Sequence, residues 1–283
     1  MYFNFIDSRD NSEYVDLHIH TTASDGIMDT KDIALVAYKK GLKAIAITDH
    51  DTTEGLKNIE SIDFIEIVPG IELSTTYGTE EFHILGYYID PENLYLKKEL
   101  EKFAKKRIER VKKIIEKLNY IGIDISYEEV KSFAEEGTIG RPHIARMLIE
   151  KGYVFDELEA FNRYLMPTKP AYVARQRVSP WKAIELIKAS GGLAFWAHPE
   201  YSSDNSSYLV EQFVEWGIHG IEVVHPIQID QSIQKYWEQK ARENGLLVSG
   251  GTDFHGYEET LIEIGDVCIP YAYLDEIKKR LRK

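Results

Sequence analysis

Short apolar runs alternate along the chain with longer amphipathic segments. The apolar runs predict seven β-strands, at Tyr14–His20, Lys43–Thr48, Ile65–Val68, Phe82–Tyr88, Gly192–Ala197, Gly220–Val224 and Leu246–Ser249. Several of these runs are rich in β-branched residues, which is typical of parallel strands covered on both faces. The amphipathic segments predict helices, each followed by a glycine that serves as a stop signal, at Thr30–Lys40, Pro180–Ala189, Ser207–Trp216 and Asp230–Asn244.

This alternation predicts an α/β protein, a distorted TIM-like (β/α)7 barrel, with an open doubly wound sheet as the alternative. It stops between residues 91 and 172, where the pattern predicts only helices, at Leu94–Tyr120, Tyr127–Glu135, Pro142–Lys151 and Asp156–Leu165. We therefore expect a barrel domain of residues 14–90 and 173–283, with a helical insert of residues 91–172 that caps the substrate.

Composition adds few constraints. An apolar fraction of 43% in 283 residues is enough for a sizeable core. The single cysteine, Cys268, cannot form an intramolecular disulfide. The first residues lack the pattern of a signal peptide, and the longest apolar runs are too short to span a bilayer. We expect a cytoplasmic protein with no membrane partner.

The charge is unevenly distributed. The chain carries −13 in total, which disfavours a protein that coats polyanions with its whole surface. Residues 97–117 nevertheless contain ten basic side chains against four acidic ones, a local charge of +6. This predicted helix either guides nucleic acid toward the active site or presents an ordinary solvated face.

Histidines and acids gather at the ends of the predicted strands. His18 and His20 end the first strand, and because alternate strand residues share a face, their side chains point the same way. The other members of this set are Asp25, His50, Glu72, His83 at the start of the fourth strand, His198, Asp253 and His255. In a barrel the carboxyl ends of the strands meet at one mouth, where active sites lie.

Imidazole and carboxylate ligands without cysteine favour zinc, manganese or iron(II) over a structural zinc site. An isolated histidine near a strand end is more often a packed, hydrogen-bonded residue than a ligand. So many ionisable groups in one barrel mouth, however, would be costly unless something bound them. We therefore predict a metal centre.

The motifs HIHTTASDG, TDHDT, GIELS, FHILGY, AHPE and SGGTDFHG, between His18 and Gly256, resemble those of the PHP (polymerase and histidinol phosphatase) superfamily. The residues of these motifs are most similar to those of the branch that contains nucleoside 3′,5′-bisphosphate phosphatases and 5′→3′ exoribonucleases. That branch also has a helical insert. The resemblance implies a metal-dependent phosphoesterase that hydrolyses nucleotide phosphate esters.

The resemblance also implies three divalent ions of Mn, Fe or Zn. The first would be held by His18, His20, Glu72 and Asp253, the second by Glu72, His83 and His198, and the third by Asp25, His50 and His255. Glu72 would bridge two positions, and a hydroxide bridging the metals would attack phosphorus in line. Three acidic ligands against six positive charges favour a phosphate dianion, such as a 3′,5′-bisphosphonucleotide or the 5′-phosphate of a short RNA or DNA oligonucleotide.

Four further residues are candidates for substrate contacts. Arg141 and His143 open a helix of the predicted insert, where they either hold a second phosphate or merely cap the helix. Arg175 and Arg177 follow the insert, and a purely structural role is at least as plausible for them.

His225 follows the sixth strand, and it either protonates the leaving group or packs beside the ligands. His219 precedes the same strand, so we expect it at the surface of the opposite end.

Three other functions fit the sequence less well. A histidinol-phosphate phosphatase would share the metal centre and differ in its substrate pocket. A metal-dependent amidohydrolase would need a lysine where the chain has His83, and it would leave Asp25, His50 and His255 without a role. A catalytically silent PHP module that supports a polymerase is disfavoured because every family ligand position is filled.

Overall fold

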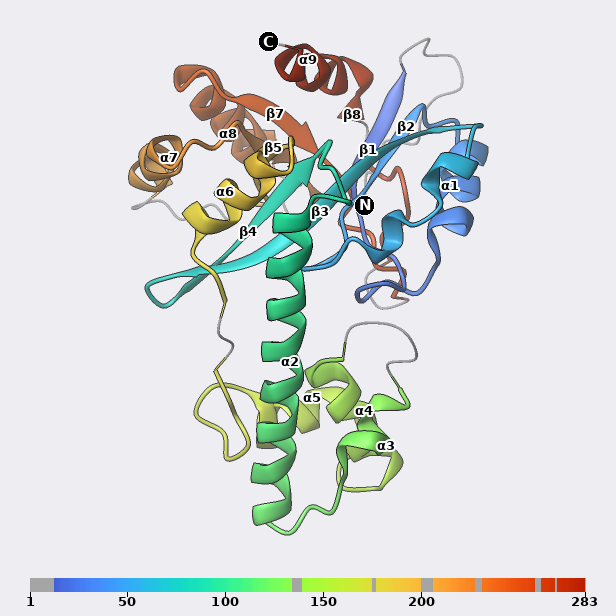
Figure 1. Cartoon of the computed structure of the whole chain (residues 1–283), viewed down its shortest axis with the longest axis vertical. Helices are drawn as coiled ribbons and strands as arrows, with labels where there is room; N and C mark the ends of the chain where they lie inside the picture. Colours follow the sequence, from blue (N-terminus) through green and yellow to red (C-terminus); the bar gives the residue numbers. More distant parts are fainter. Residues whose placement is uncertain are drawn as a thin grey trace. The chain divides into compact units, whose positions relative to one another are not determined.

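The computed structural model describes residues 13–133, 139–174, 177–199, 206–226, 231–257, 261–267 and 269–282. The chain divides into two compact units (Figure 1). Unit 1 consists of Met1–Lys97 and Val178–Lys283, and unit 2 consists of Lys98–Arg177. Unit 2 begins and ends a few residues later than the insert of residues 91–172 expected from the sequence.

Unit 1 contains one sheet of eight strands in the spatial order β7-β6-β5-β4-β3-β2-β1-β8. The strands are β1 (Tyr14–Ile19), β2 (Ala44–Ile47), β3 (Glu66–Tyr77), β4 (Glu80–Tyr87), β5 (Leu193–Trp196), β6 (Gly220–Val224), β7 (Leu247–Gly250) and β8 (Ile269–Pro270). The first seven correspond to the predicted strands, whereas the two-residue β8 carries no periodic signal and was not predicted.

The chain beyond β7 returns to β1. Ile19, the last residue of β1, forms a parallel bridge with Phe254. The backbone N–H of His20 donates to the carbonyl oxygen of Phe254 at 2.9 Å. These bonds nearly close the sheet into a distorted barrel, and the predicted α/β barrel class is confirmed.

The fourth strand departs from a regular (β/α) pattern. β4 pairs antiparallel with both β3 and β5, whereas β1–β3 and β5–β7 pair in parallel. Only Gly78 and Thr79 connect β3 to β4, too few residues for the crossover that parallel strands require. Gly78 has a φ of +63°, a conformation that glycine adopts without strain. The start of β4 therefore lies beside the carboxyl ends of the parallel strands.

The helices described in unit 1 are α1 (Thr30–Lys39), α6 (Pro180–Ala189), α7 (Ser206–Glu215), α8 (Gln231–Glu243) and α9 (Tyr271–Leu281), with short 3-10 turns at Glu54–Leu56 and Ile59–Ser61. Asp29 caps α1 by accepting the N–H of Asp32 at 2.8 Å. The unpredicted α9 buries Leu274 and Ile277 in one apolar cluster with residues of β1, β2, β4 and β5. Burial of this face stabilises the short helix.

His219 was expected at the surface but lies half-buried in front of β6. Its Nδ1 accepts the backbone N–H of Ala194 at 3.0 Å. Burial, followed by the charges of Lys188 and Arg280, lowers the pKa of His219 to about 4. The ring is therefore a neutral acceptor in the folded chain.

Unit 2 is helical in its described residues. It contains α2 (Leu94–Tyr120) from Lys98 onward, α3 (Tyr127–Lys131), α4 (Arg141–Glu150), α5 (Glu157–Ala160) and a π-helical turn (Phe161–Leu165). Val111, Ile114 and Leu118 of α2 enter a common apolar core with Ile144 and Leu148 of α4. This core buries the apolar side of the amphipathic helix α2.

Among the helices of the described residues, none combines the length and the apolar composition that a membrane span needs.

Candidate metal centre

The side chains of His18 and His20 lie together on one face of the end of β1. Both rings are fully buried, and their Nε2 atoms are 3.1 Å apart. Oδ1 of Asp253 lies 3.2 Å from Nε2 of His18 and 3.0 Å from Nε2 of His20. Oε2 of Glu72 is 3.4 Å and 3.2 Å from the same two nitrogens. These four residues, which the sequence predicts as the first ligand group, lie close enough together to hold one ion.

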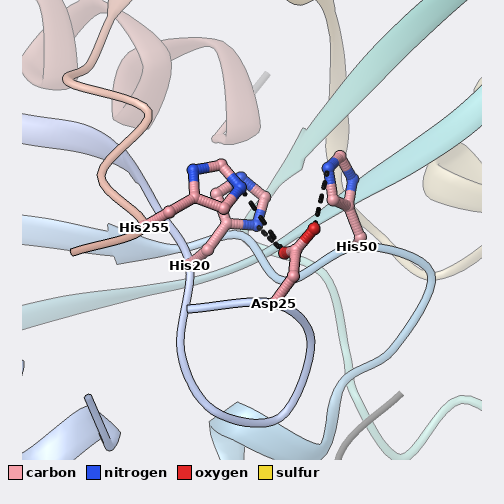
Figure 2. A group of neighbouring side chains, drawn as sticks. All are labelled: His20, Asp25, His50 and His255. Carbon is pink, nitrogen blue, oxygen red and sulfur yellow. Dashed lines mark ion pairs between the residues drawn. The ribbon is translucent and has the colours of Figure 1, made fainter. Parts of the chain in front are cut away.

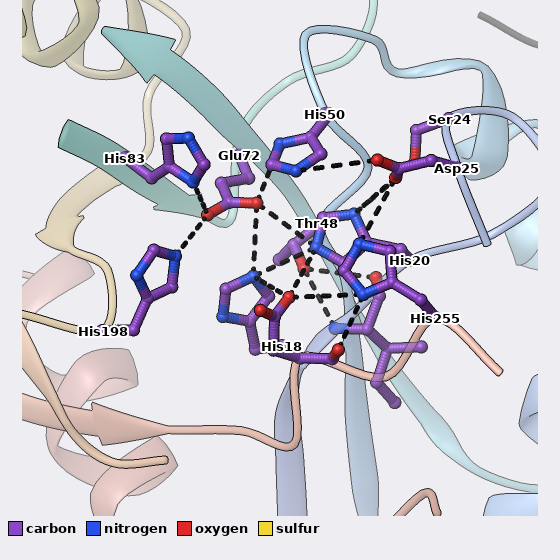
Figure 3. A network of polar contacts seen from close by, with 12 residues as sticks. His18, His20, Ser24, Asp25, Thr48, His50, Glu72, His83, His198 and His255 are labelled. Atoms are coloured by element: carbon purple, nitrogen blue, oxygen red, sulfur yellow. Dashed lines mark hydrogen bonds and ion pairs between the residues drawn. The ribbon is translucent and has the colours of Figure 1, made fainter. Parts of the chain in front are cut away.

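Glu72 contacts two different sets of imidazoles with its two oxygens (Figure 3). Oε1 lies 2.9 Å from Nδ1 of His83 and 3.1 Å from Nε2 of His198. Oε2 faces His18 and His20, and it lies 2.9 Å from Nδ1 of His50. Glu72 is thus placed between two groups of nitrogen ligands, as a bridging carboxylate would be.

Asp25 gathers a third group from the loop after β1 (Figure 2). Its Oδ1 lies 3.5 Å from Nε2 of His255 and 3.6 Å from Nδ1 of His20, and its Oδ2 lies 3.9 Å from Nε2 of His50. The ligand atoms of these four residues lie close enough to share one ion. His20 and His50 therefore each belong to two groups, which the sequence-based division did not anticipate.

Several atoms of this cluster are buried without a hydrogen bond from the described residues. They are Oδ1 of Asp25, Oε2 of Glu72, Oδ1 of Asp253 and Nδ1 of His50. A buried carboxylate oxygen without a donor costs free energy unless a cation compensates it. The orphaned atoms all point into the histidine cluster, and this donor set fits divalent ions that bind oxygen and nitrogen.

The electrostatics of the cluster point the same way. Burial raises the pKa of Glu72, but the imidazoles of His50 and His83 outweigh burial and hold that pKa well below its usual range. Burial lowers the pKa of His20, but the adjacent carboxylates of Asp253 and Glu72 raise that pKa to about 10. Without an ion, a proton on His20 offsets part of the charge of these carboxylates. A metal ion would replace that proton, because histidine binds metals in its neutral form.

Two of the candidate ligands have backbones in the left-handed region. The φ of His198 is +27° and that of Asp253 is +53°. Such angles are uncommon in residues other than glycine, and they persist only where surrounding contacts hold them. Here they aim two ligands at the cluster from the ends of β5 and β7.

Three buried carboxylates outside the ligand set hold the ligand-bearing segments, and sequence reasoning missed all of them. Asp16 accepts Oγ1 of Thr252 at 2.7 Å and the N–H of Thr252 at 2.9 Å. Asp49 accepts Oγ of Ser24 at 2.6 Å and the N–H of Thr21 at 2.7 Å. Asp16 thus fixes the residue before Asp253, and Asp49 fixes the loop that leads to Asp25.

Glu222, in the middle of β6, is the third of these carboxylates. It is fully buried, its Oε1 lies 3.0 Å from Nδ1 of His18, and its Oε2 accepts the backbone N–H of His198 at 2.7 Å. Asp16 shares one face of its strand with His18 and His20, because every second residue of a strand points the same way. Asp49 lies inside the TDHDT motif, so the sequence contained a signal for both residues. Glu222 had none, because it follows no motif.

The structure places the remaining candidates as follows. His225 is buried beside the cluster, with its Nε2 3.5 Å from Oδ2 of Asp253. Arg141 donates to the carbonyl oxygen of Leu165 at 3.3 Å, and His143 accepts the N–H of Gly140 at 3.1 Å through Nδ1. The His143 bond caps the start of α4, and the Arg141 bond links α4 to the end of the π-helical turn, both within unit 2.

Two arginines remain from the sequence-based candidates. Arg175 lies outside the described residues. Arg177 is partly buried at the end of unit 2.

Comparisons with known proteins identify the family. A PHP-domain family model matches residues 16–105. A 5′-3′ exoribonuclease of Haemophilus influenzae is 34% identical over 246 residues, which cover 85% of this chain and 89% of that protein. A 3′,5′-nucleoside bisphosphate phosphatase of Chromobacterium violaceum is 31% identical over 258 residues, which cover 89% of this chain and 90% of that protein.

The fold agrees with this assignment. A solved structure from Bifidobacterium adolescentis, provisionally described as a metal-dependent phosphoesterase, has a TM-score of 0.81 and 27% identity, and the match covers 95% of this chain and 96% of that one. The chain is therefore a member of the PHP family of metal-dependent phosphoesterases, as its motifs predicted.

Proposed function

We propose that this chain hydrolyses phosphate esters of nucleotides, with 3′,5′-bisphosphonucleotides and 5′-phosphorylated oligoribonucleotides as substrates. We further propose that it uses three divalent ions of Mn, Fe or Zn. The observation that carries the proposal is the position of Glu72, whose two oxygens face different groups of imidazoles. The names of the similar proteins, an exoribonuclease and a bisphosphate phosphatase, support the nucleotide substrate.

The charge of the ligand set favours a phosphate over a neutral ester. The three groups together contain three carboxylates, those of Asp25, Glu72 and Asp253. Bound divalent ions would exceed this negative charge, lower the pKa of bound water to about 7 and polarise the phosphoryl oxygens. The histidines contribute no negative charge, so the loaded site is positive and attracts a dianion.

The protein's own groups would then orient the reaction. Glu222 holds the ring of His18 through Nδ1, which leaves Nε2 facing the cluster. Asp16 and Asp49 fix the segments that carry Asp253 and Asp25. We assign His225, beside Oδ2 of Asp253, to protonation of the leaving oxygen.

Arg141 and His143 are proposed to bind a second phosphate of the substrate. One guanidinium nitrogen of Arg141 donates a hydrogen bond to the carbonyl oxygen of Leu165. A guanidinium has five N–H donors, arranged in a fork that suits phosphate. Because Nδ1 of His143 accepts a hydrogen bond, the neutral ring carries its proton on Nε2 as a donor. Loss of either residue should raise KM for bisphosphates more than for monophosphates.

A substrate panel tests the proposal. The manganese-, iron- or zinc-loaded protein is assayed with a 3′,5′-bisphosphonucleotide, a short 5′-phosphorylated RNA and histidinol phosphate, together with metal analysis. We expect turnover of the nucleotides, and loss of turnover in Glu72→Gln. Glu66→Gln is the matched control, because Glu66 lies on the same strand but pairs with Lys278. Turnover of histidinol phosphate alone would refute the nucleotide as the substrate. Absence of turnover with every metal tested would refute the proposed enzymatic activity.

A further inference from the structure

The two units of the chain have opposite charges. Unit 2, Lys98–Arg177, contains 17 lysines and arginines against 13 acidic residues, a net charge of +4 with neutral histidines. The rest of the chain therefore carries −17. A polyanion that approaches this protein is repelled by the surface of unit 1 outside its metal centre, and unit 2 is the part that attracts it.

The positive charge of unit 2 is concentrated on one side of α2. Six exposed lysines share that side, which we call the lysine face: Lys98, Lys102, Lys105, Lys106, Lys112 and Lys113. At 100° per residue these six side chains fall within about 120° of the helix circumference, over a length of about 22 Å. The exposed acids Glu109 and Glu116 fall within the same arc, so the lysine face carries six positive and two negative charges, a net +4. Val111, Ile114 and Leu118 lie on the opposite side of α2 and pack into the core of unit 2.

Most of these lysines are not held in an ion pair. Among the described residues, Lys98, Lys105, Lys106 and Lys113 make no ion pair or side-chain hydrogen bond. The other two have a local partner each, since Lys102 pairs with Glu99 at 2.5 Å and Lys112 lies over the ring of Tyr127 at 4.9 Å.

We propose that the lysine face binds the phosphate backbone of single-stranded RNA substrates. The inference rests on the proposed function, and it names the oligonucleotide as the substrate that uses this surface. Lysines that recognise phosphates as point charges give affinity without base specificity. An RNA held on α2 is held by the same polypeptide that carries the metal centre, which raises the effective concentration of its 5′ end there.

Removal of three charges from the lysine face tests this surface. The variant carries Lys105→Gln, Lys106→Gln and Lys113→Gln, because glutamine retains a high helix propensity. The matched control carries Lys31→Gln, Lys39→Gln and Lys57→Gln, which remove three exposed lysines from unit 1. Binding is measured by fluorescence anisotropy on the metal-loaded protein. The probe is a 5′-phosphorylated RNA with cleavage-resistant phosphorothioate linkages, titrated between about 0.05 and 0.2 M salt.

We expect the lysine-face variant to bind this RNA about tenfold more weakly, and its salt slope to fall by about 2, because each lost phosphate contact on a single strand removes about 0.7. The control should keep the wild-type slope, and hydrolysis of a 3′,5′-bisphosphonucleotide should be unchanged in both variants. An unchanged slope in the lysine-face variant, or an equal loss in the control, would overturn the proposal.

Two further arms separate the alternatives. Polyglutamate that competes as well as RNA of equal charge would show that the face fits acidic proteins, which contradicts the proposal. Absence of any phosphatase activity, with RNA binding and its lysine dependence intact, would refute the proposed function but not the RNA-binding face.

Discussion

Oε1 of Glu222 lies 3.0 Å from Nδ1 of His18, and both side chains are fully buried. The second oxygen of the same carboxylate accepts the backbone N–H of His198 at 2.7 Å. One side chain on β6 thus supports a candidate ligand from β1 and another after β5. It fixes the ring of the first and the unusual backbone, with a φ of +27°, of the second.

Glu222→Gln should weaken metal binding without removing any ligand. A glutamine side chain has one oxygen and one NH₂ group, whereas His18 and His198 both present donors to this position. In the variant, the NH₂ group must therefore face the N–H of either His18 or His198, and two donors then oppose each other. We expect metal affinity to fall about 10- to 100-fold, as measured by calorimetric titration of Mn²⁺ into metal-free protein. The same affinity in the variant and the wild type would show that Glu222 has no positioning role, and Glu66→Gln controls for loss of a partly buried glutamate.

Glu72→Gln should disturb two ligand groups at once, because its oxygens contact separate sets of histidines. The comparison needs a second variant that disturbs only one ligand group, and the structure shows which residue to choose. His50 lies between Glu72 and Asp25 and belongs to two groups, so His50→Ala is not the clean single-site change that the sequence suggests. His83→Ala is better, because His83 belongs to one group. Metal analysis should show a larger loss of bound metal in Glu72→Gln than in His83→Ala, and equal losses would argue against a bridging role.

Gly251→Ala should destabilise the fold and displace a ligand. A Cβ on Gly251 would lie 2.2 Å from Cβ and 2.3 Å from the backbone N of His18. Neither atom can move without shifting β1, so we expect a loss of about 3 kcal/mol or more in the free energy of unfolding, together with reduced metal content. Gly140→Ala is the control, because its nearest neighbour would be Cδ of Pro142 at 3.5 Å. Chemical denaturation of both variants checks this, and a Gly251→Ala protein as stable as Gly140→Ala would contradict it.

His219 should make the stability of the chain fall on acidification. Its pKa is about 4 in the folded chain against about 6.5 in an unfolded one, so the unfolded state binds the proton first as the pH falls. Stability from this group is complete above pH 6.5 and is lost between about pH 6.5 and 4. The loss is on the order of 1–2 kcal/mol, because partial exposure of the ring screens the effect.

The variant His219→Gln isolates this contribution. Glutamine retains an acceptor for the N–H of Ala194 but does not titrate. The difference in unfolding free energy between wild type and variant should therefore change across this pH window and stay constant above it. A difference that is constant throughout would mean that His219 does not titrate with the assumed values.

The sequence by itself determined most of the strands and helices and the residue types of the candidate site. Alternation along Tyr14–Ile19 fixed a strand with His18 and His20 on one face, because side-chain direction in a strand is a local property. The ligand motifs lie within short segments at strand ends, so the residue types, their order and the PHP family could be recognised without coordinates.

Only the tertiary structure decided how these residues meet. The antiparallel β4 brings His83, from the start of a strand, to the mouth formed by the ends of the others. Glu222 and His18 are 204 positions apart, and no local period relates them. Strand pairing and the burial of partnered carboxylates depend on contacts between distant segments, and only the folded barrel brings those segments together.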